Sequence, residues 1–145
     1  ELATGTAVSS EILNTAWRER LDLEDVPEIT PAQAGRNLAG VVAHADLTLF
    51  AHYSTDTAGH KKSMAEARIA LETVDAFLAG LLPALPPETL MVAASDHGNI
   101  EDITQGHTRN PIFTLFLGPG APEMAARLAR ITDISGAILE YLMGQ

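Results

Sequence analysis

The feature that most constrains this chain is the alternation of short apolar segments with a long amphipathic one. Residues 46–53 (DLTLFAHY) and 89–95 (TLMVAAS) are short, β-leaning runs, and residues 61–82 between them carry apolar side chains at steps of three and four. Short apolar runs are typical of buried strands, and that spacing is typical of a helix. Strand, helix and strand in this order favour an α/β fold with a right-handed crossover, and therefore a mostly parallel sheet.

Further elements are expected on both sides of this unit. Thr30, Pro31 and Gln33 form a helix start, with Thr30 as N-cap and Gln33 closing a capping box, and this helix should run to about His44. The apolar stripe of the long helix and the prolines that end it are Met64, Ala67, Leu71, Val74, Leu78 and Leu81, then Pro83, Pro86 and Pro87. The other expected elements are helices over 9–21 (N-cap Ser9 or Ser10), 122–129 and 133–143 (N-cap Thr132), and a strand over 111–118.

Composition excludes several classes of function. The chain has 145 residues, a formal net charge of −10 and no cysteine. The missing thiols exclude disulfides and cysteine-type zinc sites, and the acidic balance argues against nucleic acid as a partner. The absence of cysteine is compatible with the cytoplasmic location that we expect. No apolar run is long enough to cross a bilayer, so we expect no membrane partner. An anionic substrate would need local neutralisation, which a bound divalent cation supplies.

Polar loops follow the first two predicted strands. Asp56 comes after the first strand and Asp96 after the second. Because the carboxyl ends of parallel strands meet at one edge of a sheet, we expect both loops at that edge. His107 precedes the strand at 111–117, so it reaches the same edge only if that strand runs antiparallel to its neighbour. We therefore predict an antiparallel strand there.

Three short motifs supply carboxylates and imidazoles to these loops. DTAGH is expected to cross from a loop into the first turn of the long helix, with Gly59 permitting a sharp bend. Each motif alone is common in an ordinary turn or helix start, but the three together at one edge predict a metal site. Carboxylate with imidazole suits zinc, manganese or iron rather than calcium. The candidate metal ligands are Asp56, His60, Asp96, His97 and His107.

The order D-x-x-x-H, D-H-G-N and H-T-x-N-P resembles the metal-binding half of the alkaline phosphatase superfamily, and is most similar to its branch of cofactor-independent phosphoglycerate mutases and phosphopentomutases. The resemblance covers about residues 46–143. It implies a three-layer α/β core and, in the complete site, two manganese or zinc ions that bind the phosphoryl group of a phosphorylated small-molecule substrate; this chain alone could hold fewer. It also implies that Asp56, His60 and His107 hold one metal and that Asp96 and His97 help to hold the second.

The family's first strand ends in an Asp ligand, and a Ser or Thr nucleophile follows it. Residues 1–45 contain no apolar strand that ends in Asp, and ATGTA at 3–7, with Thr4 and Thr6, follows no strand. The nucleophile therefore stays unknown. We expect the chain to be the C-terminal part of a longer enzyme or a truncated relative, with little or no mutase activity alone. Residues 1–30 would be a helical segment left from a cap region, and 31–145 the metalloenzyme domain.

Other polar residues have ordinary explanations beside functional ones. Arg109 and Lys61 flank proposed ligands and could pair with a substrate phosphate, although surface charges are common at such places. His52 is expected to be a hydrogen-bonded core histidine, and Asn99 and Asn110 are expected to brace the loops.

Two alternatives remain open. In one, Asp56, His60 and His107 hold a single zinc with an open water position, and the chain is a self-contained hydrolase. In the other, the chain is a truncated α/β module without chemistry, and an exposed sheet edge favours a homo-oligomer. Metal stoichiometry separates these two readings from the phosphomutase. Two metals per chain would support the phosphomutase, one metal the hydrolase, and none the module without chemistry.

Overall fold

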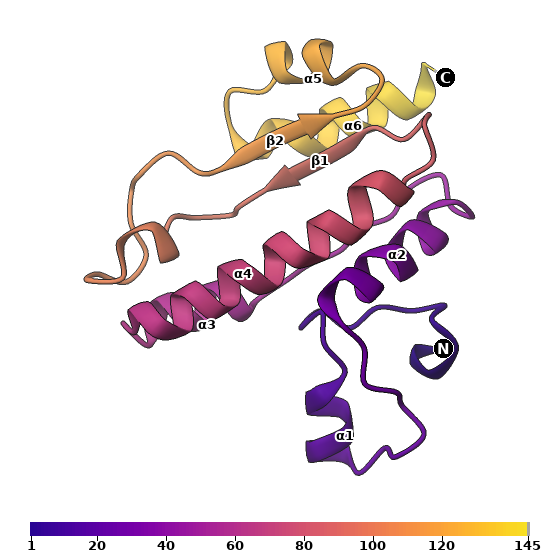
Figure 1. The fold of residues 1–145 in the computed structure, drawn as a ribbon. Coiled ribbons are helices and arrows are strands. Elements are labelled where there is room, and N and C mark those ends of the chain that lie inside the picture. Colours follow the sequence, from indigo (N-terminus) through magenta and orange to yellow (C-terminus); the bar gives the residue numbers. More distant parts are fainter. Residues whose placement is uncertain (145) are drawn as a thin grey trace. The chain divides into compact units, whose positions relative to one another are not determined.

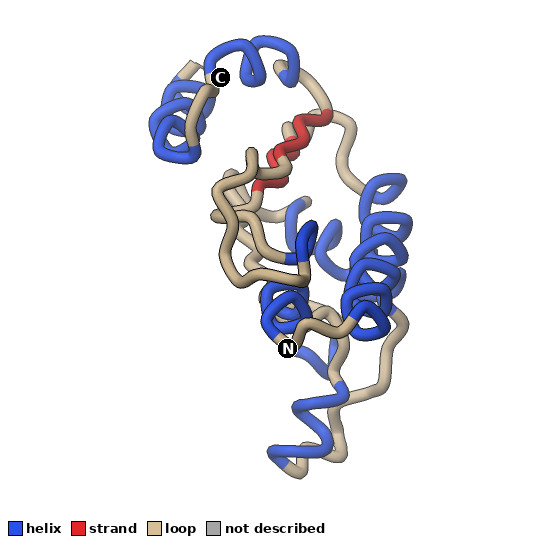
Figure 2. The backbone as a smooth tube through the Cα atoms, turned by 90° about the vertical axis from the view of Figure 1, so that its left-hand side faces the viewer, coloured by secondary structure: helices blue, strands red, loops and turns tan. Residues whose placement is uncertain are grey.

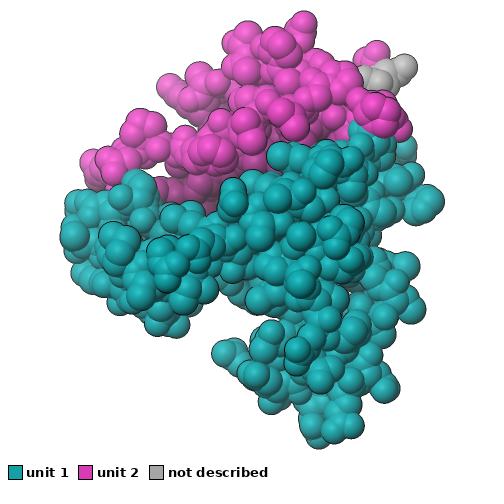
Figure 3. All heavy atoms as spheres, in the orientation of Figure 1, with its two compact units in different colours: residues 1–86, 99–106 teal, residues 87–98, 107–145 magenta. Residues whose placement is uncertain are grey.

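The computed structural model describes residues 1–144 and divides the chain into two compact units, coloured separately in Figure 3. Unit 1 comprises residues 1–86 and 99–106, and unit 2 comprises residues 87–98 with those from 107 onward. Among the described residues, no helix is both long enough and apolar enough to span a membrane. The helices of unit 1 are α1 (Thr15–Leu21), α2 (Pro31–Val42), α3 (Ser54–His60) and α4 (Met64–Leu81), with 3-10 turns at Leu2–Thr4, Leu82–Ala84 and Ile100–Asp102.

Helix α2 begins where its sequence predicts. The Thr30 hydroxyl accepts a hydrogen bond from the backbone N–H of Gln33 at 3.2 Å, and Pro31 occupies the first turn. The Gln33 side chain does not return to Thr30 as a capping box requires. It donates to Asn37 at 2.8 Å and accepts from Arg36 at 2.8 Å, so local side-chain partners replace the reciprocal cap contact. The helix ends at Val42, two residues before the predicted end.

Helices α2 and α4 lie side by side in Figure 1 and form the core of unit 1. Their backbones approach closely because glycines stand at the crossing. A Cβ on Gly35 would lie 2.2 Å from the carbonyl oxygen of Phe77, and a Cβ on Gly80 would lie 2.0 Å from that of Ala32. The buried side chains of the pair are Ala34, Leu38, Ala39, Ala67, Ala70, Phe77 and Leu81.

The apolar stripe predicted for α4 has the period of a helix, but only some of its residues are buried. Met64 and Leu71 are 69% and 50% exposed, whereas Ala67 and Leu81 are buried as expected. The sequence favoured large side chains for the buried face. The close approach of α2 instead gives much of that face to small residues, such as Ala70 and Gly80.

The first helix is shorter than predicted. Helix α1 begins at Thr15 with Asn14 as N-cap, not at Ser9 or Ser10. Ile12 has a φ of 67°, which no continuous right-handed helix permits. Ser9 has another role, since its hydroxyl accepts hydrogen bonds from the Trp17 indole at 3.1 Å and from the Glu11 backbone N–H at 3.2 Å.

Residues 46–53 form no strand within the described structure, contrary to the prediction. Their burial still alternates as in a strand: Thr48, Phe50 and His52 are half-buried. Phe50 stacks on Phe77 of α4 with ring centroids 5.2 Å apart. The intervening Leu47, Leu49 and Tyr53 are 58%, 92% and 59% exposed. A strand is defined by pairing, and along residues 1–144 this segment pairs with no strand.

His52 is a hydrogen-bonded histidine, as expected. Its Nδ1 lies 2.7 Å from the backbone oxygen of Ser10, which ties the segment to the N-terminal region of unit 1.

Unit 2 contains a two-stranded sheet, drawn in red in Figure 2. Strand β1 (Met91–Ala94) pairs with β2 (Thr114–Leu117), with Met91 opposite Leu117 and Ala94 opposite Thr114. The pairing is antiparallel, which confirms the orientation predicted for the strand at 111–117. The mixed α/β class is confirmed in this coarse form, and the mostly parallel sheet stays a prediction.

Two helices follow the sheet: α5 (Ala121–Arg127) and α6 (Ile134–Met143). The predicted cap Thr132 is wrong, because it lies inside a 3-10 turn at Ile131–Asp133. The Asp133 carboxylate accepts from the backbone N–H groups of Arg130 at 2.9 Å and Ala129 at 3.1 Å. These bonds hold the turn just before α6, so the helix starts two residues after the expected cap.

Candidate metal centre

Asp56 and His60 lie on a single short helix, α3, rather than across a loop and the next helix. Their four-residue separation therefore places them on one face, with His60 Nε2 3.5 Å from Asp56 Oδ1. The sharp change of direction comes after α3, at Lys62, whose φ is 54°. Gly59 is inside the helix, so the bend predicted at Gly59 is wrong and that glycine needs another explanation.

Asn99 holds the Asp56 side chain within unit 1. Its Nδ2 donates to Asp56 Oδ1 at 2.5 Å and to the Asp56 backbone oxygen at 3.0 Å. The residue is only 4% exposed, and its own N–H donates to Glu101 Oε2 at 2.6 Å. The sequence placed Asn99 only as a loop brace and missed this partner. The contact joins residues 43 positions apart, so no local pattern in the sequence indicated it.

Asp96 and His97 follow β1 in unit 2. His97 Nε2 lies 3.6 Å from Asp96 Oδ2, and the Ser95 hydroxyl donates to the His97 backbone oxygen at 2.6 Å. Asp96 is largely exposed, with 79% of its side chain accessible, whereas the His97 side chain is 29% accessible. Adjacent residues in a strand point to opposite faces, but Asp96 and His97 lie beyond the end of β1, where their side chains can approach each other.

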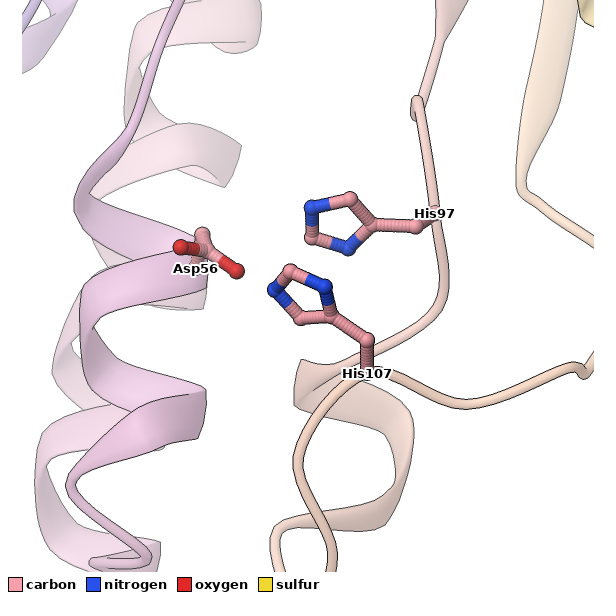
Figure 4. Close-up of side chains that lie close together, drawn as sticks. All are labelled: Asp56, His97 and His107. Atoms are coloured by element: carbon pink, nitrogen blue, oxygen red, sulfur yellow. The ribbon is translucent and has the colours of Figure 1, made fainter.

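His107 reaches His97 from the other end of the long loop. The two rings lie against each other in Figure 4. They are stacked, with centroids 3.6 Å apart and planes inclined by 25°. An antiparallel bridge between Gly98 and Thr108 brings the two loop ends together, with Thr108 N–H donating to the Gly98 oxygen at 2.8 Å. This bridge is separate from the β1–β2 ladder, and it brings the two ends of the loop, with their imidazoles, together.

Asp56 in unit 1, and His97 and His107 in unit 2, are the candidate metal ligands labelled in Figure 4. One carboxylate and two imidazoles form a donor set that fits zinc, manganese or iron. The donor chemistry therefore fits a divalent metal.

The residues predicted to bind substrate have different surroundings. Lys61 forms an ion pair with Glu66 at 2.7 Å near the start of α4, and Lys62 donates to the Thr104 oxygen at 3.3 Å. Arg109 is exposed in unit 2, two residues after His107. In the same loop, hydrogen bonds from the Thr104 and Gln105 side chains and from the Thr104 N–H lower the pKa of Asp102. Asp102 is therefore held as a carboxylate that shapes the loop.

Comparison with known proteins identifies the class of this chain. Residues 28–145 match the Metalloenzyme superfamily, and the chain belongs to that family. Membership implies that a divalent metal is used, which agrees with the candidate ligands and with the resemblance recognised in the sequence.

Individual relatives are distant. A 2,3-bisphosphoglycerate-independent phosphoglycerate mutase of Acetivibrio thermocellus is 26% identical over 67% of this chain and 20% of its own length. A phosphopentomutase of Methylobacterium radiotolerans is 34% identical over 58% of this chain and 21% of its own length. A phosphoglycerate mutase of Syntrophotalea carbinolica, also 2,3-bisphosphoglycerate-independent, is 29% identical over 81% of this chain and 24% of its own length. The chain thus spans about a fifth to a quarter of these relatives, and no solved structure matches it significantly.

Proposed function

We propose that this chain is the metal-binding part of a divalent-metal-dependent phosphomutase. The observation that carries the proposal is the stacked pair His97 and His107 at the two bridged ends of the loop between β1 and β2, together with an Asp56 carboxylate held in a fixed orientation. Membership of the metalloenzyme family and similarity to two kinds of mutase support the same function. The proposed substrate is a phosphorylated small molecule.

In this proposal Asp56, His97 and His107 are metal ligands. His60 adds an imidazole on the same face of α3 as Asp56, and Asp96 adds a carboxylate next to His97. The five side chains would serve two manganese or zinc ions in the complete site. When bound, such ions stabilise negative charge on a phosphoryl group during transfer.

The chain's own residues contribute binding and orientation. Asp56 and Asp96 bring negative charge toward the cations, while the imidazoles are neutral donors that must be deprotonated to bind. Arg109, close in sequence to His107, would bind substrate phosphate through its planar guanidinium, and Lys61 would add a second cation. A nucleophilic hydroxyl is not assigned to any residue of this chain.

A second candidate is a hydrolase with one zinc. The donor types favour it: Asp56 of unit 1 offers a carboxylate and unit 2 offers the imidazoles of His97 and His107, a group of the size that often holds catalytic zinc together with a water. This group differs from the trio that the sequence suggested for a single metal, since His97 replaces His60.

Metal content of the purified chain tests both functions. After equilibration with manganese or zinc and removal of excess metal, elemental analysis should give two equivalents per chain for the mutase part and one for the hydrolase. Asp56→Asn and His107→Ala should each lower that number. Asp75→Asn and His44→Ala are matched controls, since both residues are exposed and outside the site. A chain without metal, or control variants that lose it equally, would contradict the proposal.

A further inference from the structure

Gly59 in DTAGH and Asn99 in DHGN, two motif residues that are not themselves candidate ligands, share one contact. They meet within unit 1. A Cβ built on Gly59 would lie 2.3 Å from Asn99 Oδ1 and 2.6 Å from its Cγ. The Asn99 amide therefore lies directly against the α3 backbone, in a space that any side chain at position 59 would fill.

The orientation of that amide follows from its partners. Its Nδ2 faces two acceptors, Asp56 Oδ1 and the Asp56 backbone oxygen, at 2.5 and 3.0 Å. A flipped amide would bring its oxygen toward both acceptors, which is unfavourable. With nitrogen toward Asp56, the oxygen lies over Gly59, where the described residues offer it no hydrogen-bond partner. Burial of an acceptor in that state costs free energy, so the contact with Asp56 has to offset it.

We propose that Asn99 is the positioning residue for Asp56 as a metal ligand, and that Gly59 is glycine because Asn99 must lie against it. This inference rests on the metal-binding function proposed above. With Oδ1 held by Asn99, the rotamer of Asp56 is fixed and so is the direction of Oδ2. A ligand that is already oriented loses less conformational freedom when a metal binds.

The hydrogen bond also supports the helix that carries the ligands. Helix α3 has seven residues, too few to be stable without tertiary contacts, and Asp56 lies in its first turn. The bond to the Asp56 backbone oxygen therefore holds the turn, while the bond to Oδ1 holds the side chain. The Glu101 carboxylate in turn accepts a hydrogen bond from the Asn99 backbone N–H at 2.6 Å and so holds Asn99 in place.

Two variants remove this contact in independent ways. Asn99→Ala deletes the donor, and Gly59→Ala keeps every polar group but displaces the amide with one methyl. We expect each to weaken manganese or zinc binding about 10- to 100-fold by calorimetric titration. The double variant should bind like Asn99→Ala alone, because without the amide the added methyl meets nothing; this non-additivity is the signature of one shared contact.

Matched controls separate positioning from general stability. Asn14 is a buried asparagine of the same unit, 1% exposed, whose Nδ2 donates to the Pro27 oxygen at 3.0 Å. Asn14→Ala should lower the melting temperature and leave metal affinity unchanged. Gly40→Ala adds a methyl in a helix of the same unit where nothing lies within 4 Å, and should change neither quantity adversely.

A metal-free readout addresses the contact itself. In the apo protein, hydrogen exchange of the Asn99 side-chain amide should be slow, and Asp56→Ala should accelerate it. Equal exchange in both proteins would overturn the inference, as would wild-type metal affinity in Asn99→Ala. Absence of metal binding by the wild-type chain would overturn the proposed function along with the inference, whereas binding that resists Asn99→Ala overturns the inference alone.

Discussion

Helices α2 and α4 and the segment 46–53 belong to the same unit, yet they are held in different ways. The helix pair buries a continuous face, with backbone against backbone at Gly35 and Gly80. The segment 46–53 packs Thr48, Phe50 and His52 on one side, and Leu49 on the other side is 92% exposed. The apolar face of each helix is therefore covered by the other helix, whereas segment 46–53 is covered on one face only.

The difference follows from where the two kinds of structure find hydrogen bonds. A helix satisfies its backbone internally, so α2 and α4 need only a partner for their apolar faces. An extended segment needs a neighbouring strand for its N–H and C=O groups, and within residues 1–144 segment 46–53 pairs with none. The alternating burial of segment 46–53 shows which of its faces is packed. Within the described residues, the segment lacks the ladder of backbone hydrogen bonds to a neighbouring strand that would make it a strand.

The largest expected effect is the loss of an aromatic side chain from the helix pair. Phe77 is 4% exposed and stacks on Phe50. Phe77→Ala should lower the free energy of unfolding by roughly 3 to 5 kcal/mol, measured by urea denaturation. Phe50→Ala removes the same stacking from the half-covered segment and should cost clearly less. Equal losses would show that segment 46–53 is held as firmly as the helices.

A smaller loss is expected at the crossing itself. Gly80→Ala places a methyl 2.0 Å from the Ala32 carbonyl oxygen and should destabilise the fold by about 1 to 3 kcal/mol, because backbone atoms must move to admit it. Gly40→Ala, where there is open space, should be neutral or stabilising in the same assay. If both variants are equally stable, the helices do not approach as closely as described.

The cap of α2 should contribute less again. Thr30→Ala removes the acceptor for the Gln33 N–H and should cost about 1 kcal/mol of unfolding free energy, seen as a lower urea midpoint. Thr30→Ser keeps the hydroxyl and should restore most of the stability. Similar losses in both variants would mean that the threonine methyl, rather than the cap, is what matters.

The smallest effect on stability is expected on the uncovered face. Leu49→Ser should change the free energy of unfolding by less than about 0.5 kcal/mol, because the side chain has little burial to lose. The same change at Leu38 of α2, which is 8% exposed, should be strongly destabilising. Sedimentation over a range of concentrations would also test self-association through segment 46–53, which Leu49→Ser should weaken. A large loss of stability in Leu49→Ser would show that this face is covered.

The sequence predicted those features of the fold that depend on neighbouring residues of the chain. The start of α2 was correct because Thr30 and Pro31 act on adjacent backbone groups. The antiparallel β2 was correct because His107 and Asp96 were required at one edge, which restricted the topology. Which residues of α4 are buried depends on α2 approaching closely at Gly80, and no period within α4 contains that information.

The candidate site was predictable in its residue types and less so in its local structure. DTAGH was expected to cross from a loop into the first turn of the long helix, with Gly59 permitting a sharp bend. In the structure the same glycine lies in α3, where it makes room for Asn99, a residue 40 positions later in the sequence. A contact between residues so far apart leaves no trace in local spacing. The full ligand set, including His60 and Asp96, stays a prediction until metal content is measured.

The glycine crossing of α2 and α4 also has a consequence for how such a sequence can diverge. Each glycine faces backbone of the opposite helix, and backbone atoms are the same whatever residue supplies them. A substitution at position 35 or 80 therefore has no compensating substitution at the position it meets, unlike a large side chain that a smaller neighbour can accommodate. The two positions are expected to vary only when the helices themselves shift apart, so descendants of this sequence should keep both glycines or neither.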